Sequence, residues 1–348
     1  MKRPKPSKAV TIYEISRRAG VSIATVSRAV NPQTRHKVAP ETFRAITALV
    51  DKYGYTPNLA ARHLGGSTFK TIGLVMGYFR GLFFSDYHTK VLAGVADALL
   101  DTDYVFKLIM VKPTPKKWDR YNFKIGEGVD GLIVTHWPTF FSKASVLEAL
   151  DVPCVVINDP EHGVRAYFTG GDNVLGGKLA ARYLYAKGHR RIVVVAGPSW
   201  SSDSALRLRG FKAFFRTCGG RVRLTVVPGE FDRGQARSAA HALLKTDRSI
   251  TAFFSCNDDM ALGVLEALRE LHVRCPEDIS VMGYDDDARA QTAEPSLTTI
   301  RVPLYDIAKT GANRLVRYLT GEDTAGFAGR QTLFPVELVE RQSVRQRK

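Results

Sequence analysis

The side chains best suited to recognise another molecule lie in one short segment near the amino terminus. Arg28 can offer its planar fork to the O6 and N7 atoms of guanine, while the apolar side chains of Ile23 and Ala24 suit a thymine methyl group. The hydroxyls of Thr25 and Ser27 suit phosphate oxygens, which fix the register of a protein on DNA without reading sequence. This combination predicts contact with double-stranded DNA in the major groove.

Two short helices joined by a tight turn must position these side chains. Thr11 and Glu14 have the spacing of a capping box, which predicts the start of the first helix. Ser22 is placed to cap the second helix, on which Val26 and Val30 face a small core. This is the helix-turn-helix pattern, whose second helix enters the major groove. A solvated helical hairpin is the alternative that the pattern leaves open.

The positive charge of the chain is concentrated around these helices. The 348 residues include 50 Lys and Arg against 34 Asp and Glu, which gives a formal net charge of +16. Residues 1–70 hold 13 of the basic and 3 of the acidic residues, and therefore +10 of that charge. A local excess of this kind attracts a polyanion, either nucleic acid or an acidic membrane surface. A basic surface that serves only solubility is the alternative.

Several function classes are disfavoured by what the sequence lacks. No apolar run approaches the roughly 18–20 residues of a membrane helix, and no secretory signal follows the basic start. The cysteines show no paired framework, which is typical of reduced thiols in a cytoplasmic protein. Residues 171–178 miss the spacing of a phosphate-binding loop, and no hydrolase or metal-site motif appears. We therefore expect no enzyme, no cofactor, no metal and no membrane partner.

After residue 70 the sequence pattern changes, and short apolar runs alternate with helix-length segments. Continuous apolar strands separated in this way indicate parallel sheets covered by helices on both faces. At least eight such units predict two doubly wound lobes. The expected strands are residues 72–76, 105–111, 131–135, 154–157, 192–196, 224–227, 252–255 and 279–284.

The first part of the chain resembles the DNA-binding head of the LacI/GalR family of bacterial transcription regulators. The segments that carry this resemblance are residues 19–22, 24–28, 53–55 and 57–64, whereas Asn31-Pro32 and the loop 33–37 depart from the family pattern. The resemblance implies a sequence-specific regulator, with repression as the expected action, that associates with the nucleoid when bound to DNA. The residues for which it implies DNA contact are Ser22, Ile23, Ala24, Thr25, Ser27, Arg28, Asn31, Tyr55, Asn58, Ala61 and Leu64.

In this family residues 57–64 would form a hinge helix that folds on operator DNA. Leu64 holds the position of a leucine wedge that unstacks the central base step from the minor groove. Ordinary core packing of Leu64 is the alternative.

From residue 70 to about 341 the chain resembles the type I periplasmic-binding-protein fold that the same family carries. Its strongest matches are residues 196–198, 207–211, 257–263, 278–286 and 297–300. The resemblance implies two lobes, three crossings of the chain between them, and an effector bound in the cleft at the carboxyl ends of the strands. The residues that it assigns to effector binding are Phe84, Asn158, Arg207, Phe231, Asn257 and Asp285.

These side chains suit a small polar metabolite, and a sugar is the effector that we expect. Vicinal hydroxyls can pair with Asp285, Asn257 and the fork of Arg207, and the apolar face of the ring suits Phe231. A nucleobase, a nucleoside or a sugar phosphate remains an alternative effector. Arg207 and Asp285 would instead form a purely structural ion pair if no ligand bound there.

The predicted architecture is an all-α helix-turn-helix head followed by an α/β body with parallel doubly wound sheets. The head covers residues 9–56, and a hinge helix and linker cover residues 57–70. The body covers residues 71–341, with one lobe from 71–165 and 300–325 and the other from 166–297 and 327–341. We expect a homodimer on a near-palindromic operator, because two-fold protein symmetry requires two-fold DNA symmetry. An architectural DNA binder without an effector is the alternative of a different class.

Overall fold

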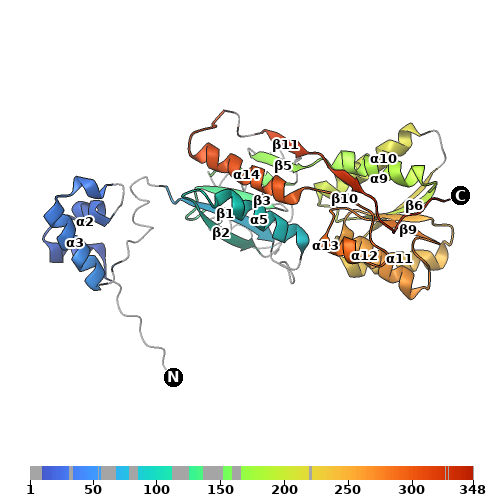
Figure 1. Ribbon diagram of the computed structural model, residues 1–348, viewed down its shortest axis with the longest axis horizontal. Coiled ribbons are helices and arrows are strands. Elements are labelled where there is room, and N and C mark those ends of the chain that lie inside the picture. Colours follow the sequence, from blue (N-terminus) through green and yellow to red (C-terminus); the bar gives the residue numbers. More distant parts are fainter. Residues whose placement is uncertain are drawn as a thin grey trace, which may run out of the picture. The chain divides into compact units, whose positions relative to one another are not determined.

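The computed structural model divides the chain into two compact units, Met1–Phe69 and Lys70–Lys348, of which Figure 1 shows the elements. We call them the head and the body. The residues that the structure describes are 10–30, 34–53, 55, 68–77, 85–111, 125–135, 152–158, 166–218, 222–325, 327 and 329–347.

The head is a cluster of short helices around a small apolar core. Its elements are α1 (Ile12–Ala19), α2 (Ile23–Val30), the 3₁₀ turn η1 (Arg35–Lys37) and α3 (Pro40–Tyr53). Amphipathic spacing makes these segments helical, since each turns one apolar stripe inward. The buried side chains at the centre are Ile15, Val26, Ala29, Ile46 and Tyr55.

The start of α2 is capped as the sequence predicts, whereas the start of α1 is not. Gly20 ends α1 with a left-handed backbone, at φ 64°, and Ser22 Oγ accepts a hydrogen bond from the Thr25 amide at 3.1 Å. The predicted capping box at Thr11 is wrong, because its side chain makes no capping hydrogen bond. The Glu14 amide instead donates to the Thr11 carbonyl oxygen, at 3.0 Å.

The first lobe of the body contains a six-stranded parallel sheet in the order β11-β5-β4-β3-β1-β2. Helices α5 (Asp86–Leu99) and α14 (Leu304–Leu319) pack against each other beside this sheet, as Figure 1 shows. Because the central strands are buried on both faces, they read as continuous apolar runs. The strands are β1 (Thr71–Gly77), β2 (Val105–Val111), β3 (Gly131–Thr135), β4 (Cys154–Ile157), β5 (Tyr167–Gly171) and β11 (Gln331–Phe334).

The second lobe contains a four-stranded parallel sheet in the order β7-β6-β8-β9. Helices α9 and α10 pack together on one side of it, and α11 and α12 on the other (Figure 1). The strands are β6 (Arg191–Ala196), β7 (Arg223–Pro228), β8 (Ala252–Ser255) and β9 (Ser280–Met282). The helices are α9 (Asn173–Ala186), α10 (Ser202–Thr217), α11 (Arg233–Thr246), α12 (Asp258–Glu270) and the short α13 (Ala288–Thr292).

The chain crosses between the lobes three times, after β5, after β10 (Thr299–Arg301) and before β12 (Glu337–Val339). Strands β10 and β12 pair antiparallel. A Cβ atom on Gly171 would lie 3.0 Å from Val302 and 3.2 Å from Val336. The three crossing segments are therefore closely packed, and a larger residue at position 171 would push against the two valines.

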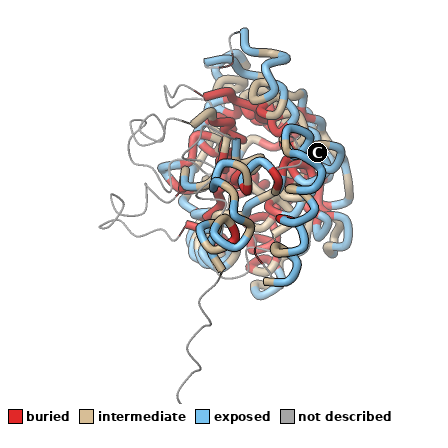
Figure 2. Tube along the Cα trace, turned by 90° about the vertical axis from the view of Figure 1, so that its left-hand side faces the viewer, coloured by how far each residue is buried: buried red, intermediate tan, exposed pale blue. Residues whose placement is uncertain are grey.

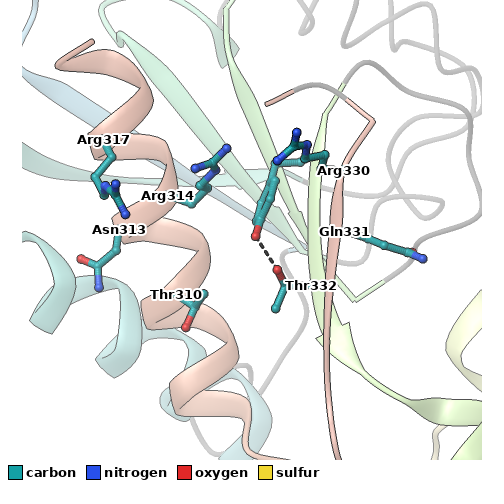
Figure 3. A pocket seen from close by; sticks show the side chains of 8 residues that line it. Thr310, Asn313, Arg314, Arg317, Arg330, Gln331 and Thr332 are labelled. Atoms are coloured by element: carbon teal, nitrogen blue, oxygen red, sulfur yellow. Dashed lines mark hydrogen bonds between the residues drawn. The ribbon is translucent and has the colours of Figure 1, made fainter. Parts of the chain in front are cut away.

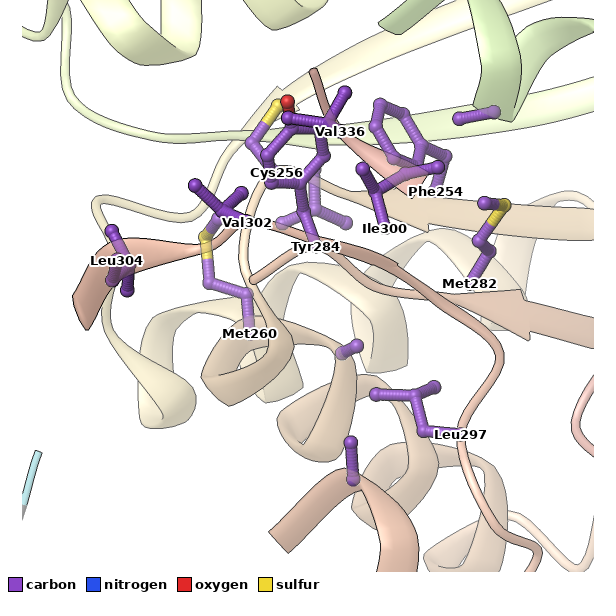
Figure 4. Packing of buried hydrophobic residues seen from close by; sticks show 14 of the residues in the cluster. Phe254, Cys256, Met260, Met282, Tyr284, Leu297, Ile300, Val302, Leu304 and Val336 are labelled. Atoms are coloured by element: carbon purple, nitrogen blue, oxygen red, sulfur yellow. The ribbon is translucent and has the colours of Figure 1, made fainter. Parts of the chain in front are cut away.

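The core of the second lobe lies against the sheet and extends toward the crossings. The rings of Phe211 and Phe254 stack with their centroids 4.7 Å apart, and Tyr284 is fully buried. Figure 4 shows Tyr284 beside Cys256 within this apolar packing, and Figure 2 shows buried segments running inside the body beneath exposed helix faces. Among the described residues no helix is long and apolar enough to cross a membrane.

The predicted fold class is confirmed, and all eight expected strands are present. The predicted division into lobes is wrong at two strands, because β5 and β11 belong to the first sheet rather than to the second lobe. The tail after residue 341 also belongs to the body, since Ser343 is fully buried and its carbonyl accepts from the Val281 amide at 2.9 Å. Strand β5 contains two glycines, and in β11 half-buried and exposed positions alternate. Neither strand therefore has the apolar run by which the other strands were predicted.

Candidate functional site

The head presents the predicted DNA-reading residues on the outer side of α2. Val26 and Ala29 are buried against the core, which turns Ile23, Ala24 and Arg28 outward. Ser22 and Ser27 are exposed as well, and Thr25 is half-buried. The structure therefore brings together six of the residues expected to contact DNA.

The remaining head residues divide into one correction and a group that the structure does not test. Tyr55 is only 7% exposed and packs in the head core. We therefore correct its expected role from DNA contact to core packing. The other expected residues lie outside the described part of the chain: Asn31, Asn58, Ala61 and Leu64, together with Phe84 of the effector group.

Between the two lobes lies a group of hydrogen-bonded and charged side chains that we call the interlobe polar cluster. It comprises Tyr87, Asn158, Asn173, Asp203, Arg207 and Asp285. The first two come from the first lobe, and the other four come from the second lobe. Asn158 and Asp285 follow the carboxyl ends of β4 and β9, where open parallel sheets bind their ligands.

Arg207 is the cation of the cluster and is only 4% exposed. Its Nε donates to Asn173 Oδ1 at 2.8 Å, its Nη1 donates to the Cys256 carbonyl, and its Nη2 lies 3.3 Å from Asp285 Oδ1. The guanidinium also lies over the Tyr284 ring, 3.9 Å from its centroid. Burial alone would lower the pKa of Arg207, but Asp285 and its other anionic neighbours outweigh burial and raise it.

Asp285 is the carboxylate that faces Arg207. Burial raises its pKa to about 6, although the Arg207 charge acts in the opposite direction. Its backbone has φ 111°, a conformation that an L-residue adopts only when its surroundings enforce it. The Asp285 amide donates to the Ile300 carbonyl at 2.8 Å, and its Oδ1 accepts no hydrogen bond from any described residue.

The loop around Asp285 is fixed by buried charges on both sides. Asp286 accepts from Arg301 at 2.8 Å and from Arg341 at 2.6 Å. Asp258 accepts from the Thr299 hydroxyl at 2.6 Å and is almost fully buried. These pairs hold the strained Asp285 backbone in place.

The first lobe contributes Asn158 and Tyr87 from the opposite side of the cluster. Asn158 Nδ2 donates to the Tyr87 hydroxyl at 3.1 Å, and Asn158 has a left-handed backbone at φ 53°. Asn158 Oδ1 is buried and accepts no hydrogen bond from any described residue. Burial raises the pKa of Tyr87, and the negative charges of Asp203 and Asp285 raise it further. The Tyr87 hydroxyl therefore lies within electrostatic reach of the second lobe.

Asp203 adds a second carboxylate beside Arg207. It is half-buried one turn earlier on α10, and its Oδ1 accepts from Asn173 Nδ2 at 2.8 Å. Burial raises the pKa of Asp203, while Arg207 and Asn173 act against that rise. Asn173 thus bridges the two side chains, because its amide oxygen accepts from Arg207.

Phe231 and Asn257 follow β7 and β8 of the second lobe, the two strands that flank β6. Phe231 is half-buried, has φ 54°, and its ring covers Gly197, where a Cβ atom would lie 2.4 Å from the ring. Asn257 follows β8, and its Oδ1 accepts from the Met260 amide at 2.9 Å, which caps α12. The side-chain oxygen of Asn257 is therefore occupied by the helix, and only its amide nitrogen is left for a ligand.

Sequence reasoning missed Tyr87, Asn173 and Asp203. Tyr87 is the second residue of α5, and its segment carries none of the motifs on which the site was predicted. Asn173 follows Asp172, which caps α9 through a hydrogen bond that its Oδ1 accepts from the Leu175 amide at 2.8 Å, so the sequence of this pair indicates local structure alone. Position 203 lies one helical turn before Arg207, and that i, i+4 spacing is the signal that could have identified it.

A helix-turn-helix head followed by a two-lobed body with a polar cluster between its lobes defines a class: DNA-binding proteins controlled by a small ligand. Two protein-family models match this chain, one in the head and one in the body. Residues 11–58 match "Bacterial regulatory proteins, lacI family", and residues 181–344 match "Periplasmic binding protein-like domain".

Known relatives match nearly the whole chain. The HTH-type transcriptional regulator CelR of Thermobifida fusca is 31% identical over 90% of this chain and 93% of its own length. The repressor PurR of Klebsiella pneumoniae (strain 342) is 33% identical over 88% of this chain and 89% of its own length. The chain therefore belongs to the LacI family of bacterial transcription regulators.

Solved structures agree with this assignment. The complex of CelR with cellobiose has 28% sequence identity and a TM-score of 0.71, with 96% of this chain and 99% of that chain covered. The lac repressor dimer bound to operator has 25% identity and a TM-score of 0.76, with 97% and 100% covered. The head is thus a DNA-binding domain, and the body has the fold that carries effectors in this family.

Proposed function

We propose that this protein is an operator-binding regulator whose affinity for DNA is controlled by an uncharged sugar bound at the interlobe polar cluster. The observation that carries this proposal is the charge balance of the cluster. Arg207 is its cation, whereas Asp203 and Asp285 are both carboxylates. Most donors of Arg207 are already directed at protein oxygens, so the cluster offers acceptors rather than free cations.

This balance favours a ligand that donates several hydrogen bonds. Within the cluster, Asn158 Oδ1 and Asp285 Oδ1 are buried acceptors that receive no hydrogen bond from any described residue, and Asp285 Oδ1 has only the ion-pair contact with Arg207 at 3.3 Å. A buried acceptor left without a hydrogen bond costs about 1–3 kcal/mol. Vicinal hydroxyls of a sugar can satisfy both of them. A sugar phosphate would place its negative charge against two carboxylates. The relative solved with cellobiose, and the ribose operon repressor of Escherichia coli at 29% identity, agree with a sugar.

The DNA side of the proposal is a homodimer on a near-palindromic operator, read by the exposed face of α2. The lac repressor, to which this chain is similar over its full length, is solved as a dimer on operator. Effector binding would change the angle between the lobes and so the affinity for DNA. Such coupling between two sites is reciprocal.

A thermal-shift screen tests the effector class. Neutral sugars, sugar phosphates, nucleosides and purine bases are compared with the full-length protein. A ligand at about 100 times its dissociation constant adds roughly 2.7 kcal/mol of stability. We expect stabilisation by one or more neutral sugars and its loss in Asp285→Asn. Stabilisation by phosphorylated ligands alone, or by purines alone, would contradict the proposal.

A further inference from the structure

A polar cavity lies within the first lobe, between α14 and β11, and Figure 3 shows it from close by. Its volume is about 460 Å³, which falls within the range of small-molecule sites. It is lined by three arginines and by neutral polar side chains: Arg314, Arg317, Arg330, Tyr167, Thr310, Asn313, Gln331 and Thr332. We call it the arginine groove.

The arginine groove is distinct from the interlobe polar cluster. Tyr167 and Arg330 stand at the amino-terminal ends of β5 and β11, whereas Asn158 follows the carboxyl end of the parallel neighbour β4. The two sites therefore lie at opposite ends of the parallel strands of the same sheet. A variant in the groove can be made without touching the cluster.

The charges in the groove are only partly balanced. Arg314 pairs with Asp323, and Arg317 lies 3.8 Å from Glu322. Arg330 has no acidic partner in the part of the chain that the structure describes, and its backbone carbonyl is fixed by the Phe168 amide at 2.8 Å. The backbone of Arg330 is therefore held by the sheet, while its exposed guanidinium carries a charge that is left for a ligand.

Arg314 supplies a second unused donor on the opposite side of the groove. Its side chain is 13% exposed, and its Nε is buried without a hydrogen-bond acceptor among the described residues. Figure 3 shows Arg314 reaching from α14 toward β11, where Arg330 and Thr332 lie, while Gln331 points away. A buried donor left unsatisfied costs about 1–3 kcal/mol unless a ligand accepts from it.

We propose that the arginine groove binds a small phosphorylated metabolite, with the phosphate held between Arg314 and Arg330. Guanidinium groups present their donors in a fixed fork that matches phosphate oxygens, and charge-assisted hydrogen bonds of this kind are the strong ones. The neutral hydroxyl and amide side chains of the groove would contact the rest of the molecule. This site is separate from the proposed sugar site. It favours an anionic ligand, whereas the sugar site favours an uncharged one.

The test uses the full-length protein and inorganic phosphate or glycerol phosphate as probes, titrated calorimetrically at constant ionic strength. We expect saturable binding that Arg330→Gln weakens about tenfold or more, equivalent to about 1.4 kcal/mol. Arg330→Lys keeps the charge without the guanidinium fork, so its affinity should lie between those of the unaltered protein and Arg330→Gln. Arg216→Gln, an exposed arginine on α10, is the matched control and should bind as the unaltered protein does.

Several outcomes would overturn the proposal. One is the absence of saturable binding. Another is equal weakening by Arg216→Gln, which would indicate a nonspecific effect of net charge. Loss of binding in Arg207→Gln but not in Arg330→Gln would place the anion at the interlobe cluster. Weaker DNA binding by Arg330→Gln without any binding of the phosphate probes would assign the groove to DNA. A response of Arg330→Gln to neutral sugars shows independently that the variant is folded.

Discussion

The head and the interlobe polar cluster present their functional side chains in opposite ways. On α2 the residues expected to read DNA are exposed, and a core of a few side chains such as Val26 and Ile46 holds the helix. In the cluster Arg207 is buried and hydrogen-bonded to protein atoms on several sides. The exposed DNA-reading side chains contribute little to the stability of the head, whereas the buried ligand-binding side chains also stabilise the body. Substitutions should therefore separate function from stability in the head and couple them in the body.

Arg207→Gln is expected to have the largest effect. It leaves the half-buried carboxylates of Asp203 and Asp285 without the buried cation between them, and breaking a buried ion pair from one side costs about 3–5 kcal/mol. The free energy of unfolding of the body, measured by urea titration, should fall by that amount. Arg216→Gln on the same helix is exposed and should change it by less than about 0.5 kcal/mol. A loss below about 1 kcal/mol for Arg207→Gln would contradict the assigned role.

Arg28→Ala tests the opposite behaviour in the head. A bidentate contact to guanine contributes about 1–3 kcal/mol of discrimination, so operator preference should fall by about five- to a hundredfold. The unfolding free energy should change by less than about 0.5 kcal/mol, because Arg28 is exposed. Fluorescence anisotropy over a panel of half-site variants measures the preference, with the exposed Arg44→Ala on α3 as the control. Unchanged preference would show that α2 does not read sequence through Arg28.

The cluster should also respond to pH in a way that the head does not. Burial raises the pKa of Asp285 to about 6, so its carboxylate is ionised above that value and protonated below it. A sugar hydroxyl that donates to the carboxylate loses its acceptor on protonation. Effector affinity should therefore fall by up to about tenfold per pH unit below pH 6. Asp285→Asn should bind weakly at every pH, and an unaltered pH profile in that variant would refute this role.

The same shift has a defined consequence for stability. The usual pKa of an aspartate in the unfolded chain is about 3.9, and the folded value is higher. The folded state therefore binds the proton more tightly, and the contribution of Asp285 to stability is present below about pH 4 and is lost as the pH rises through 6. Comparison of the unaltered protein with Asp285→Asn isolates this contribution from other acidic groups.

Tyr87→Phe should have the smallest effect and sharpens the comparison between lobes. It removes the hydroxyl that accepts from Asn158, at a cost of about 1 kcal/mol in stability or in effector affinity. Tyr305→Phe removes an exposed hydrogen bond to Asp97 and serves as the control, with a change near zero expected. Equal effects of the two substitutions, measured by urea titration and by effector titration, would remove Tyr87 from the site.

The difference between the two regions also explains what the sequence could predict. The α2 residues follow from helical periodicity, because each apolar position such as Val26 determines which neighbours face outward. The strands of both sheets follow from their apolar runs. The positions of Arg207 and Asp285 followed only from family resemblance, since nothing local brings residues so distant in the chain together.

The parts that the sequence did not predict depend on tertiary contact. Tyr87 reaches Asn158 only because α5 packs on the first sheet, and its own segment carries no motif. Asp203 becomes part of the site through Asn173, a residue of another helix. Strands β5 and β11 pair across a separation of more than a hundred residues. Strand β5 is buried but ends in two glycines, and β11 is short and partly exposed, so neither holds an apolar run that would reveal this pairing.

The central claim is that a sugar at the interlobe polar cluster controls binding of DNA by the head. The most direct measurement is the affinity of the full-length protein for labelled operator DNA, with and without the sugar that the thermal screen identifies. We predict a change of about five- to a hundredfold, an equal change in sugar affinity when operator is added, and loss of both in Asp285→Asn. A sugar that binds the body and leaves operator affinity unchanged would contradict the account.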